Sequence, residues 1–211
     1  MTDKTKPAYL SLPKEHHFDF TYLITVLKSY LSPRDKITKM LKRGEIVRLK
    51  KGLYVLSPEY GGILNLNMTA NALYGPSCVS LDSALAAYSL IPERVTVVTS
   101  VTPNRSKNFS TPIGDFSYQH VRKEAFPIGM VYVKGEKGGY FMAAKEKALC
   151  DKVMAASNIR TLPEIKAFLL DDLRIDENDL KNPDPALLSA LHGGYGLKKI
   201  GLLCRWLAGL R

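Results

Sequence analysis

The stretch EIVRLKKGLYVL, which begins at Glu45, constrains the fold more than any other part of the sequence. Its apolar residues recur at every second position on both sides of a Lys-Lys-Gly corner. This alternation is typical of two short antiparallel strands joined by a tight turn, so it predicts a hairpin of residues 46–49 and 53–56. Strand pairing does not explain why the corner is strongly positive, so the charge requires a separate explanation.

Two helical patterns precede this hairpin. Residues 20–31 place their apolar side chains on one helical face and therefore predict a first helix. A second helix is predicted to begin with Pro33, because Ser32 is a suitable capping residue and proline fits the first helical position. Gly44 is expected to end it. Its buried stripe is predicted to consist of Ile37, Met40 and Leu41.

The positive charge is concentrated around these elements. The chain carries 30 Lys and Arg against 20 Asp and Glu, a formal net charge of +10, and residues 28–51 alone hold nine basic side chains against two acidic ones. Such a block favours a polyanionic partner, and nucleic acid is favoured over a membrane because no amphipathic aromatic face accompanies it. An ordinary solvated basic face is the alternative interpretation.

The order of helix, short connection, basic helix and basic hairpin is typical of a winged helix-turn-helix. In that fold the second helix enters the major groove of DNA, and the hairpin contacts the flanking backbone or minor groove. A further helix would have to come from residues 9–18, whose pattern is not clearly helical. We expect Lys39 and Arg43 to contact base edges, with Arg34 and Lys36 as alternatives. The full set of candidate DNA-binding side chains is Arg34, Lys36, Lys39, Lys42, Arg43, Arg48, Lys50 and Lys51.

Beyond residue 58 the pattern changes to short strands and helices. Runs of β-branched and aromatic residues predict strands at residues 95–101 and 129–133, within FSYQHV and within YFMA. Residues 103–108 are predicted to be a polar turn, and GEKGG a hairpin corner. Ser80 is expected to cap the helix LDSALAAYSL.

From residue 145 onward four helical patterns follow, and Thr161 and Asp184 are suited to cap two of them. The sequence therefore predicts an α+β protein of two domains. The predicted domains are a winged helix-turn-helix at 1–58 and a second domain at 59–211, with a small mixed α/β sheet region at 59–144 and a helical C-terminal part at 145–211.

Cysteine usage and hydropathy bound the environment of the chain. Cys78, Cys150 and Cys204 are odd in number, far apart and outside any CxxC pair, which favours reduced, mostly buried thiols in a cytoplasmic protein over disulfides or a zinc site. No apolar run reaches eighteen residues, so no membrane span is predicted. The polar N-terminal stretch also lacks the apolar centre of a signal peptide.

One cluster of charges could serve an enzyme. Lys145, Glu146 and Lys147 are followed by Asp151 a turn later, and Asp115 lies upstream. A metal-dependent nuclease needs an acid and an acid-x-Lys element to hold a divalent cation and activate water. Here the acid and lysine are adjacent in a helical pattern, where solvation or local pairing is the more ordinary interpretation. No catalytic residue is therefore assigned, and we expect the protein not to be an enzyme.

No other motif predicts a bound group. The four histidines have no metal-ligand spacing, and neither a glycine-rich phosphate loop nor a GxSxG element occurs. We therefore expect no metal and no cofactor.

Several blocks together resemble the AbiEi family of type IV antitoxins. They are LKRGEIVRLKKGLYVL, then SCVSLDSALAAYSLIPERVTVVTSVTPNRSKNF, GDFSYQHV and AAKEKALCDKV, in the order found in that family, across roughly residues 20–155. The combination of S-x-x-SAL-x-x-x-x-L-I, the threonine-rich strand, Arg105 and EKAL-x-D carries the resemblance. The helical remainder at 156–211 is similar to the family in helical character only. At the N-terminus the chain departs from the family, because only about twenty residues precede the first clear helix.

The resemblance implies a DNA-binding repressor and antitoxin. The N-terminal domain would bind inverted repeats in the promoter of its own operon, and the antitoxin domain would counteract an AbiEii-type nucleotidyltransferase-like toxin in an abortive-infection system of phage defence. Antitoxins of type IV oppose the effect of the toxin without forming a stable complex with it, so the partner is a functional one.

Two other functions stay open from the sequence. One is a stand-alone winged-helix transcription regulator whose second domain senses a ligand or dimerises, and the other, with less support, is a nucleic-acid-cleaving enzyme. For antitoxin activity the candidate surface is Arg105 and Lys107, because a turn just beyond a strand more often carries a site. Packing alone would explain Ser80 and the threonines of the neighbouring strand.

Overall fold

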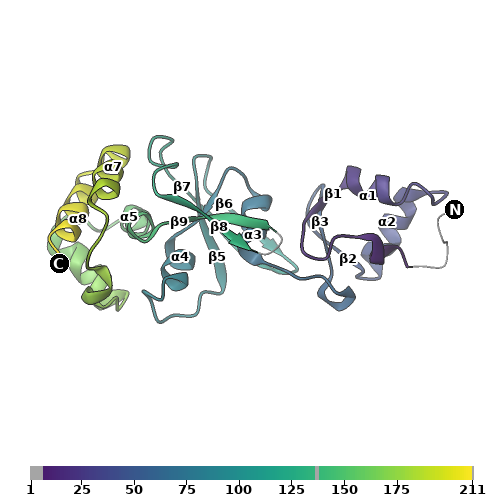
Figure 1. The fold of residues 1–211 in the computed structure, drawn as a ribbon, viewed down its shortest axis with the longest axis horizontal. Coiled ribbons are helices and arrows are strands. Elements are labelled where there is room, and N and C mark those ends of the chain that lie inside the picture. Colours follow the sequence, from purple (N-terminus) through teal and green to yellow (C-terminus); the bar gives the residue numbers. More distant parts are fainter. Residues whose placement is uncertain (1–6, 136–137, 211) are drawn as a thin grey trace. The chain divides into compact units, whose positions relative to one another are not determined.

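The computed structural model describes residues 7–135 and 138–210, which form eight α-helices and two β-sheets. The expected mixed α and β composition is confirmed. The chain divides into two compact units. Figure 1 labels their helices and strands. The first unit contains the residues up to Leu73 together with Ser110–Gly114, and the second contains Tyr74–Phe109 and Asp115–Arg211.

The first unit combines three α-helices with a small antiparallel sheet. Its strands lie in the order β1-β3-β2, and short 3-10 turns occur at Ala8–Ser11 and Pro58–Tyr60. The helices are α1 (Phe20–Val26), α2 (Pro33–Lys42) and α3 (Leu66–Leu73), and the strands are β1 (Phe18–Asp19), β2 (Ile46–Lys50) and β3 (Leu53–Leu56).

The predicted hairpin is confirmed in β2 and β3. Val47 pairs with Val55, and the register shifts between Arg48 and Lys50 just before the turn. Gly52 in that turn has φ of +85°, a conformation that a residue with a side chain adopts only with strain. The alternating sequence and the glycine together therefore specify this hairpin.

The core of the first unit comes from the apolar stripes of these elements. Ile37 and Met40 of α2 are buried against Leu23 of α1, Ile46 of β2 and Leu56 of β3. The predicted stripe is thus confirmed for its first two residues, whereas the third is only partly buried. Helix α2 ends at Lys42, just before Gly44, the residue that was expected to end it.

The predicted first helix is too long. It was expected to continue to residue 31, but α1 ends at Val26, and the side chain of Leu31 is fully exposed. The chain instead turns after Leu27, whose carbonyl accepts from the amide of Tyr30. Helical backbone is disfavoured at the residue before a proline, so Ser32 separates the two helices. Its side chain forms no capping hydrogen bond.

The second unit is built on a six-stranded mixed sheet. Its strands lie in the order β6-β7-β5-β4-β9-β8; β5 runs parallel to β7, and β4 runs parallel to β9. The strands are β4 (Cys78–Val79), β5 (Val97–Thr102), β6 (Lys107–Thr111), β7 (Gly114–His120), β8 (Met130–Gly135) and β9 (Gly138–Ala143).

Five α-helices belong to the same unit, and α7 packs beside α8 (Figure 1). A π-helical segment at Ala167–Asp172 continues α6, and a 3-10 turn occupies Glu177–Leu180. The helices are α4 (Leu81–Ala87), α5 (Lys145–Ala155), α6 (Leu162–Lys166), α7 (Pro185–Tyr195) and α8 (Lys198–Ala208).

The sequence anticipated most of this sheet but not all of it. The four strands expected after residue 95 are confirmed as β5, β7, β8 and β9, whereas the predicted turn at 103–108 is wrong at its end, because β6 begins at Lys107. The two-residue strand β4 was not anticipated. Gly135 and Gly138 pair across the expected GEKGG corner, whose residues 136–137 lie outside the described residues.

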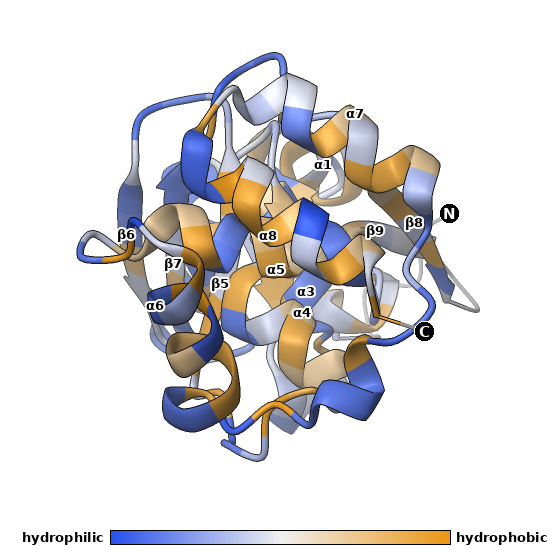
Figure 2. Cartoon of the chain, turned by 90° about the vertical axis from the view of Figure 1, so that its left-hand side faces the viewer, coloured by the Kyte–Doolittle hydropathy of each residue, from blue (hydrophilic) through white to orange (hydrophobic). Residues whose placement is uncertain are grey.

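Two of the C-terminal helices, α6 and α7, begin directly after their predicted capping residues. Thr161 caps α6 as predicted, in a capping box with Glu164, and the carboxylate of Asp184 accepts from two amides at the start of α7. Figure 2 shows apolar and hydrophilic residues alternating along α8, and its apolar residues Ile200 and Leu203 are fully buried. Among the described residues no helix is both long enough and apolar enough to cross a membrane.

Candidate functional site

The predicted DNA-binding residues lie on α2 and on the β2–β3 hairpin, and we call them the basic face. Seven of the eight side chains are exposed, and Lys36 is half-buried. The same elements bury their apolar residues in the core of the first unit. The basic face consists of Arg34, Lys36, Lys39, Lys42, Arg43, Arg48, Lys50 and Lys51.

Three members of the basic face have local partners. The Lys50 ammonium donates to the Leu73 carbonyl at 2.6 Å and so ties the hairpin to the end of α3. Arg43 lies 3.6 Å from the Glu45 carboxylate, and Lys36 lies 5.1 Å from the centre of the Tyr30 ring. In the part of the chain that the structure describes, the other five take part in no ion pair.

The candidate antitoxin residues Arg105 and Lys107 lie in the second unit, both exposed, between β5 and the start of β6. The Lys107 ammonium lies 4.7 Å from the centre of the Phe109 ring and 5.6 Å from that of Tyr74. The Tyr74 hydroxyl donates to the Arg105 carbonyl at 3.1 Å. The Lys107 ammonium therefore lies against an aromatic cluster, and the backbone of Arg105 is bonded to the same cluster.

A buried polar network that sequence patterns did not identify lies within the second unit. The Ser80 hydroxyl donates to the Asp151 carboxylate at 2.6 Å, and the Tyr195 hydroxyl donates to the other oxygen of that carboxylate. The Lys147 ammonium lies 3.6 Å from the carboxylate and donates to the Ala125 carbonyl at 3.2 Å. Ser80, Lys147 and Asp151 are wholly buried, so the network joins α4, α5 and α7 inside the core.

Burial governs the protonation of these groups. Desolvation raises the pKa of Asp151, and the nearby Lys147 ammonium and the donated hydrogen bonds oppose that shift. The pKa of the Tyr195 hydroxyl is also raised, first by burial and then by the adjacent carboxylate. Burial raises the pKa of the Cys78 thiol to about 12, so this cysteine is a neutral core residue at neutral pH.

One expectation about this region is wrong. Ser80 occupies the position before α4, but its hydroxyl bonds to Asp151 and caps no helical amide. Lys147 pairs with Asp151 four residues later, which confirms local pairing, one of the two alternatives expected from the sequence. Tyr195 gave no sequence signal, because its partner lies 44 residues away.

The charge cluster considered for a nuclease does not assemble into a metal site. The Glu146 carboxylate accepts from the Asp184 amide at 3.2 Å, and Asp115 is exposed on β7. Within residues 7–135 and 138–210, no three His, Cys, Asp or Glu side chains gather as they would around a metal ion. All three cysteines are free and buried, as expected.

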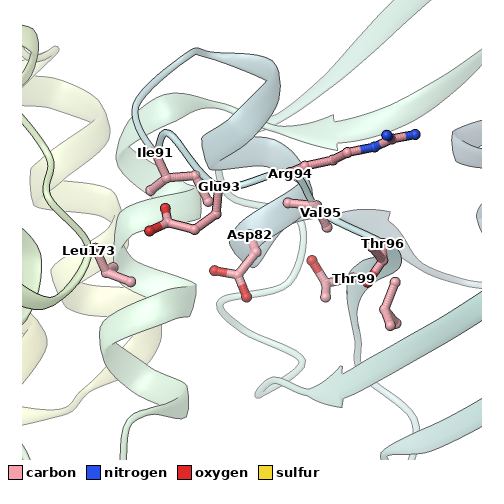
Figure 3. A pocket seen from close by; sticks show the side chains of 9 residues that line it. Asp82, Ile91, Glu93, Arg94, Val95, Thr96, Thr99 and Leu173 are labelled. Carbon is pink, nitrogen blue, oxygen red and sulfur yellow. The ribbon is translucent and has the colours of Figure 1, made fainter.

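A pocket of about 400 Å³ lies at the start of β5 (Figure 3). Ile91, Val95 and Leu173 give it apolar walls, and Arg94 extends away from the other lining side chains. Both of its carboxylates are already paired, Asp82 with Lys152 at 2.6 Å and Glu93 with Arg174. The pocket therefore presents no unpaired carboxylate that would select a cationic ligand.

No family model matches the chain, and no curated protein matches it.

Proposed function

We propose that the protein is a double-stranded DNA-binding repressor whose α2 and β2–β3 hairpin act as a winged helix-turn-helix on inverted repeats in its own promoter. The separation of apolar from charged side chains in the first unit carries this proposal. Helix α2 and the hairpin bury their apolar residues and expose their cations. A recognition helix and wing need that division between a packed face and a phosphate-binding face.

The contacts within the basic face refine which residues contact DNA. Arg48 and Lys51 on the hairpin are exposed and take part in no ion pair among the described residues, so they are the strongest candidates for phosphate contact. Lys50 is a weaker candidate because its ammonium already binds the Leu73 carbonyl. Lys39 is favoured over Arg43 for contact with base edges, since Arg43 is paired with Glu45.

Promoter DNA binding tests this proposal directly. Reversing both Arg48 and Lys51 to Glu removes two phosphate contacts and adds repulsion, so the affinity for every DNA sequence should fall about tenfold or more. Fluorescence anisotropy with a labelled duplex from the promoter measures this. The matched control reverses Lys181 and Lys198, two exposed lysines of the second unit. Equal affinity of the Arg48/Lys51 variant and this control would exclude the hairpin as a DNA-binding wing.

We further propose that the protein acts in the cytoplasm as the antitoxin of a type IV toxin–antitoxin pair, and the resemblance of its sequence blocks to AbiEi proteins supports this. The proposal requires a nucleotidyltransferase-like toxin encoded beside the protein, and the test is growth of cells that co-express the two. We expect the protein to restore growth and the Arg48/Lys51 variant to protect equally well, because repression and protection would use different units. Failure of the unaltered protein to protect would leave a DNA-binding regulator.

A further inference from the structure

The second unit carries a second positively charged surface that the DNA-binding proposal does not use. It lies where β5 and β7, which run parallel, come to their carboxyl ends. Thr102 at the end of β5 pairs with His120 at the end of β7, and the Val121 amide donates to the Thr102 carbonyl at 2.9 Å. The segments that follow these two strands are therefore neighbours, at the kind of edge where open parallel sheets bind ligands.

These two segments carry four cations. Arg105 and Lys107 follow β5, and Arg122 and Lys123 follow β7; all four are exposed. One acid accompanies them, Glu124, which lies 3.6 Å from Arg122. The local charge is therefore clearly positive, and we call these four residues the strand-end surface.

Aromatic rings lie directly beside Lys107, one of these cations. Tyr74 and Phe109 are half-buried, with ring centres 5.7 Å apart, and both contact the buried ring of Tyr118. The Lys107 ammonium lies over the outer two rings. A lysine over a ring is a favourable pair by itself, but its flexible stem allows the ammonium to move to a phosphate and leave the ring to a base.

Cations interleaved with aromatic rings are the chemistry that binds a single nucleic-acid strand, since cations track the phosphates and bases stack on the rings. A paired duplex keeps its bases stacked on each other and gains little from such rings. An acidic peptide would use the cations but not the stacking. We therefore infer that the strand-end surface, with Tyr74 and Phe109, binds single-stranded nucleic acid without strong sequence preference.

The contrast with the pocket at the opposite end of β5 supports this choice. There Asp82 and Glu93 are neutralised by Lys152 and Arg174. At the carboxyl end, none of the ion pairs among the described residues neutralises Arg105 or Lys107. Unpaired charge beside aromatic rings occurs at only one of these two ends.

The test uses the full-length protein and a labelled ten-nucleotide oligouridylate, followed by fluorescence anisotropy at about 50 mM salt. Replacing both Arg105 and Lys107 by Ala removes two phosphate contacts and should weaken binding about tenfold or more. The Phe109→Leu variant keeps an apolar residue in the cluster but removes the stacking face, so it should weaken binding about fivefold or more. A labelled oligothymidylate shows whether the surface distinguishes RNA from DNA.

Three controls establish whether oligouridylate binding depends on the strand-end surface in particular. Removing the same charge at Lys181 and Lys198 should leave oligouridylate binding unchanged. Reversing Arg48 and Lys51 should also leave it unchanged while duplex binding weakens about tenfold or more. Conservative exchange of the pair, Arg105→Lys with Lys107→Arg, should retain binding. Circular dichroism and thermal unfolding establish that each variant is folded.

Four results would overturn the inference. They are no binding of the oligonucleotide at low salt, binding that survives loss of Arg105 and Lys107, loss of binding on reversal of Arg48 and Lys51, or equally tight binding of a poly-glutamate peptide. The third result would assign single-strand binding to the basic face, and the fourth would make the surface a general polyanion site. A failure of duplex binding with retained oligouridylate binding would reject the DNA-binding proposal and leave this one standing.

Discussion

Helices α2 and α5 have similar compositions but use their charges in opposite ways. Each contains five charged residues among ten or eleven. In α2 only Ile37 and Met40 are buried, and four of the five charged side chains are exposed to solvent. In α5 seven residues are buried, and Glu146, Lys147 and Asp151 are among them. The comparison shows that charge in a helix indicates a partner only where the helix has a free side.

The physical reason is the number of elements packed around each helix. The core of the first unit lies on one side of α2, so a single apolar stripe satisfies it. In the second unit α5 contacts α4, α7, α8 and β9, which leaves no broad solvent face. Its charged groups must therefore find partners inside the core, because an unpaired buried charge is strongly unfavourable.

The largest effect should come from breaking the buried pair. Asp151→Ala leaves the Lys147 ammonium buried without its carboxylate and removes the acceptor of two hydroxyls, so it should lower the free energy of unfolding by about 3–5 kcal/mol. Urea unfolding followed by circular dichroism measures this. Lys39→Ala in α2 removes an exposed charge and should change stability by less than about 0.5 kcal/mol. Similar losses for both variants would show that the two helices do not differ as described.

A smaller effect concerns pH. Burial raises the pKa of Asp151, so the folded state holds its proton more tightly than the unfolded state, where the pKa is about 3.9. The contribution of this group is therefore fully present below about pH 4 and is lost as pH rises through the higher folded pKa. We expect the unfolding free energy of the protein, relative to Asp151→Asn, to fall as pH increases over this window.

The opposite trend would be equally informative. If relative stability increased with pH, the Lys147 ammonium and the hydrogen bonds from Ser80 and Tyr195 would outweigh desolvation. Asp35→Asn in α2, measured over the same pH range, is the matched control, because Asp35 is exposed and lies outside the buried network.

Sequence patterns predicted the buried residues of elements that are packed on one side, such as α2, better than those of elements that are packed on all sides, such as α5. In the first unit a helical stripe and a two-residue alternation identified α2 and the β2–β3 hairpin, because each pattern reports one buried face. The boundary of α1 was missed because Leu31 continued the stripe although the chain had already turned at Leu27. A local pattern cannot distinguish an apolar residue on a helix from one in the turn after it.

The buried network was beyond local patterns for a different reason. The Ser80 hydroxyl and the Asp151 carboxylate are 71 residues apart, and a serine before a helix is ordinarily a cap. The one local signal was the spacing of Lys147 and Asp151 among Ala148, Leu149 and Cys150. Because Glu146 and Lys152 flank the pair, this spacing alone could not show that the pair lies inside the fold.

The central claim is that the exposed cations of α2 and the hairpin serve a nucleic-acid partner. The most direct measurement is the salt dependence of binding to promoter duplex by the full-length protein. With about six phosphate contacts, the logarithm of affinity should fall against the logarithm of salt concentration with a slope near −5, and Lys51→Ala should reduce the slope by about 0.9. Tight binding with a slope near zero, or a slope that Lys51→Ala leaves unchanged, would contradict the claim.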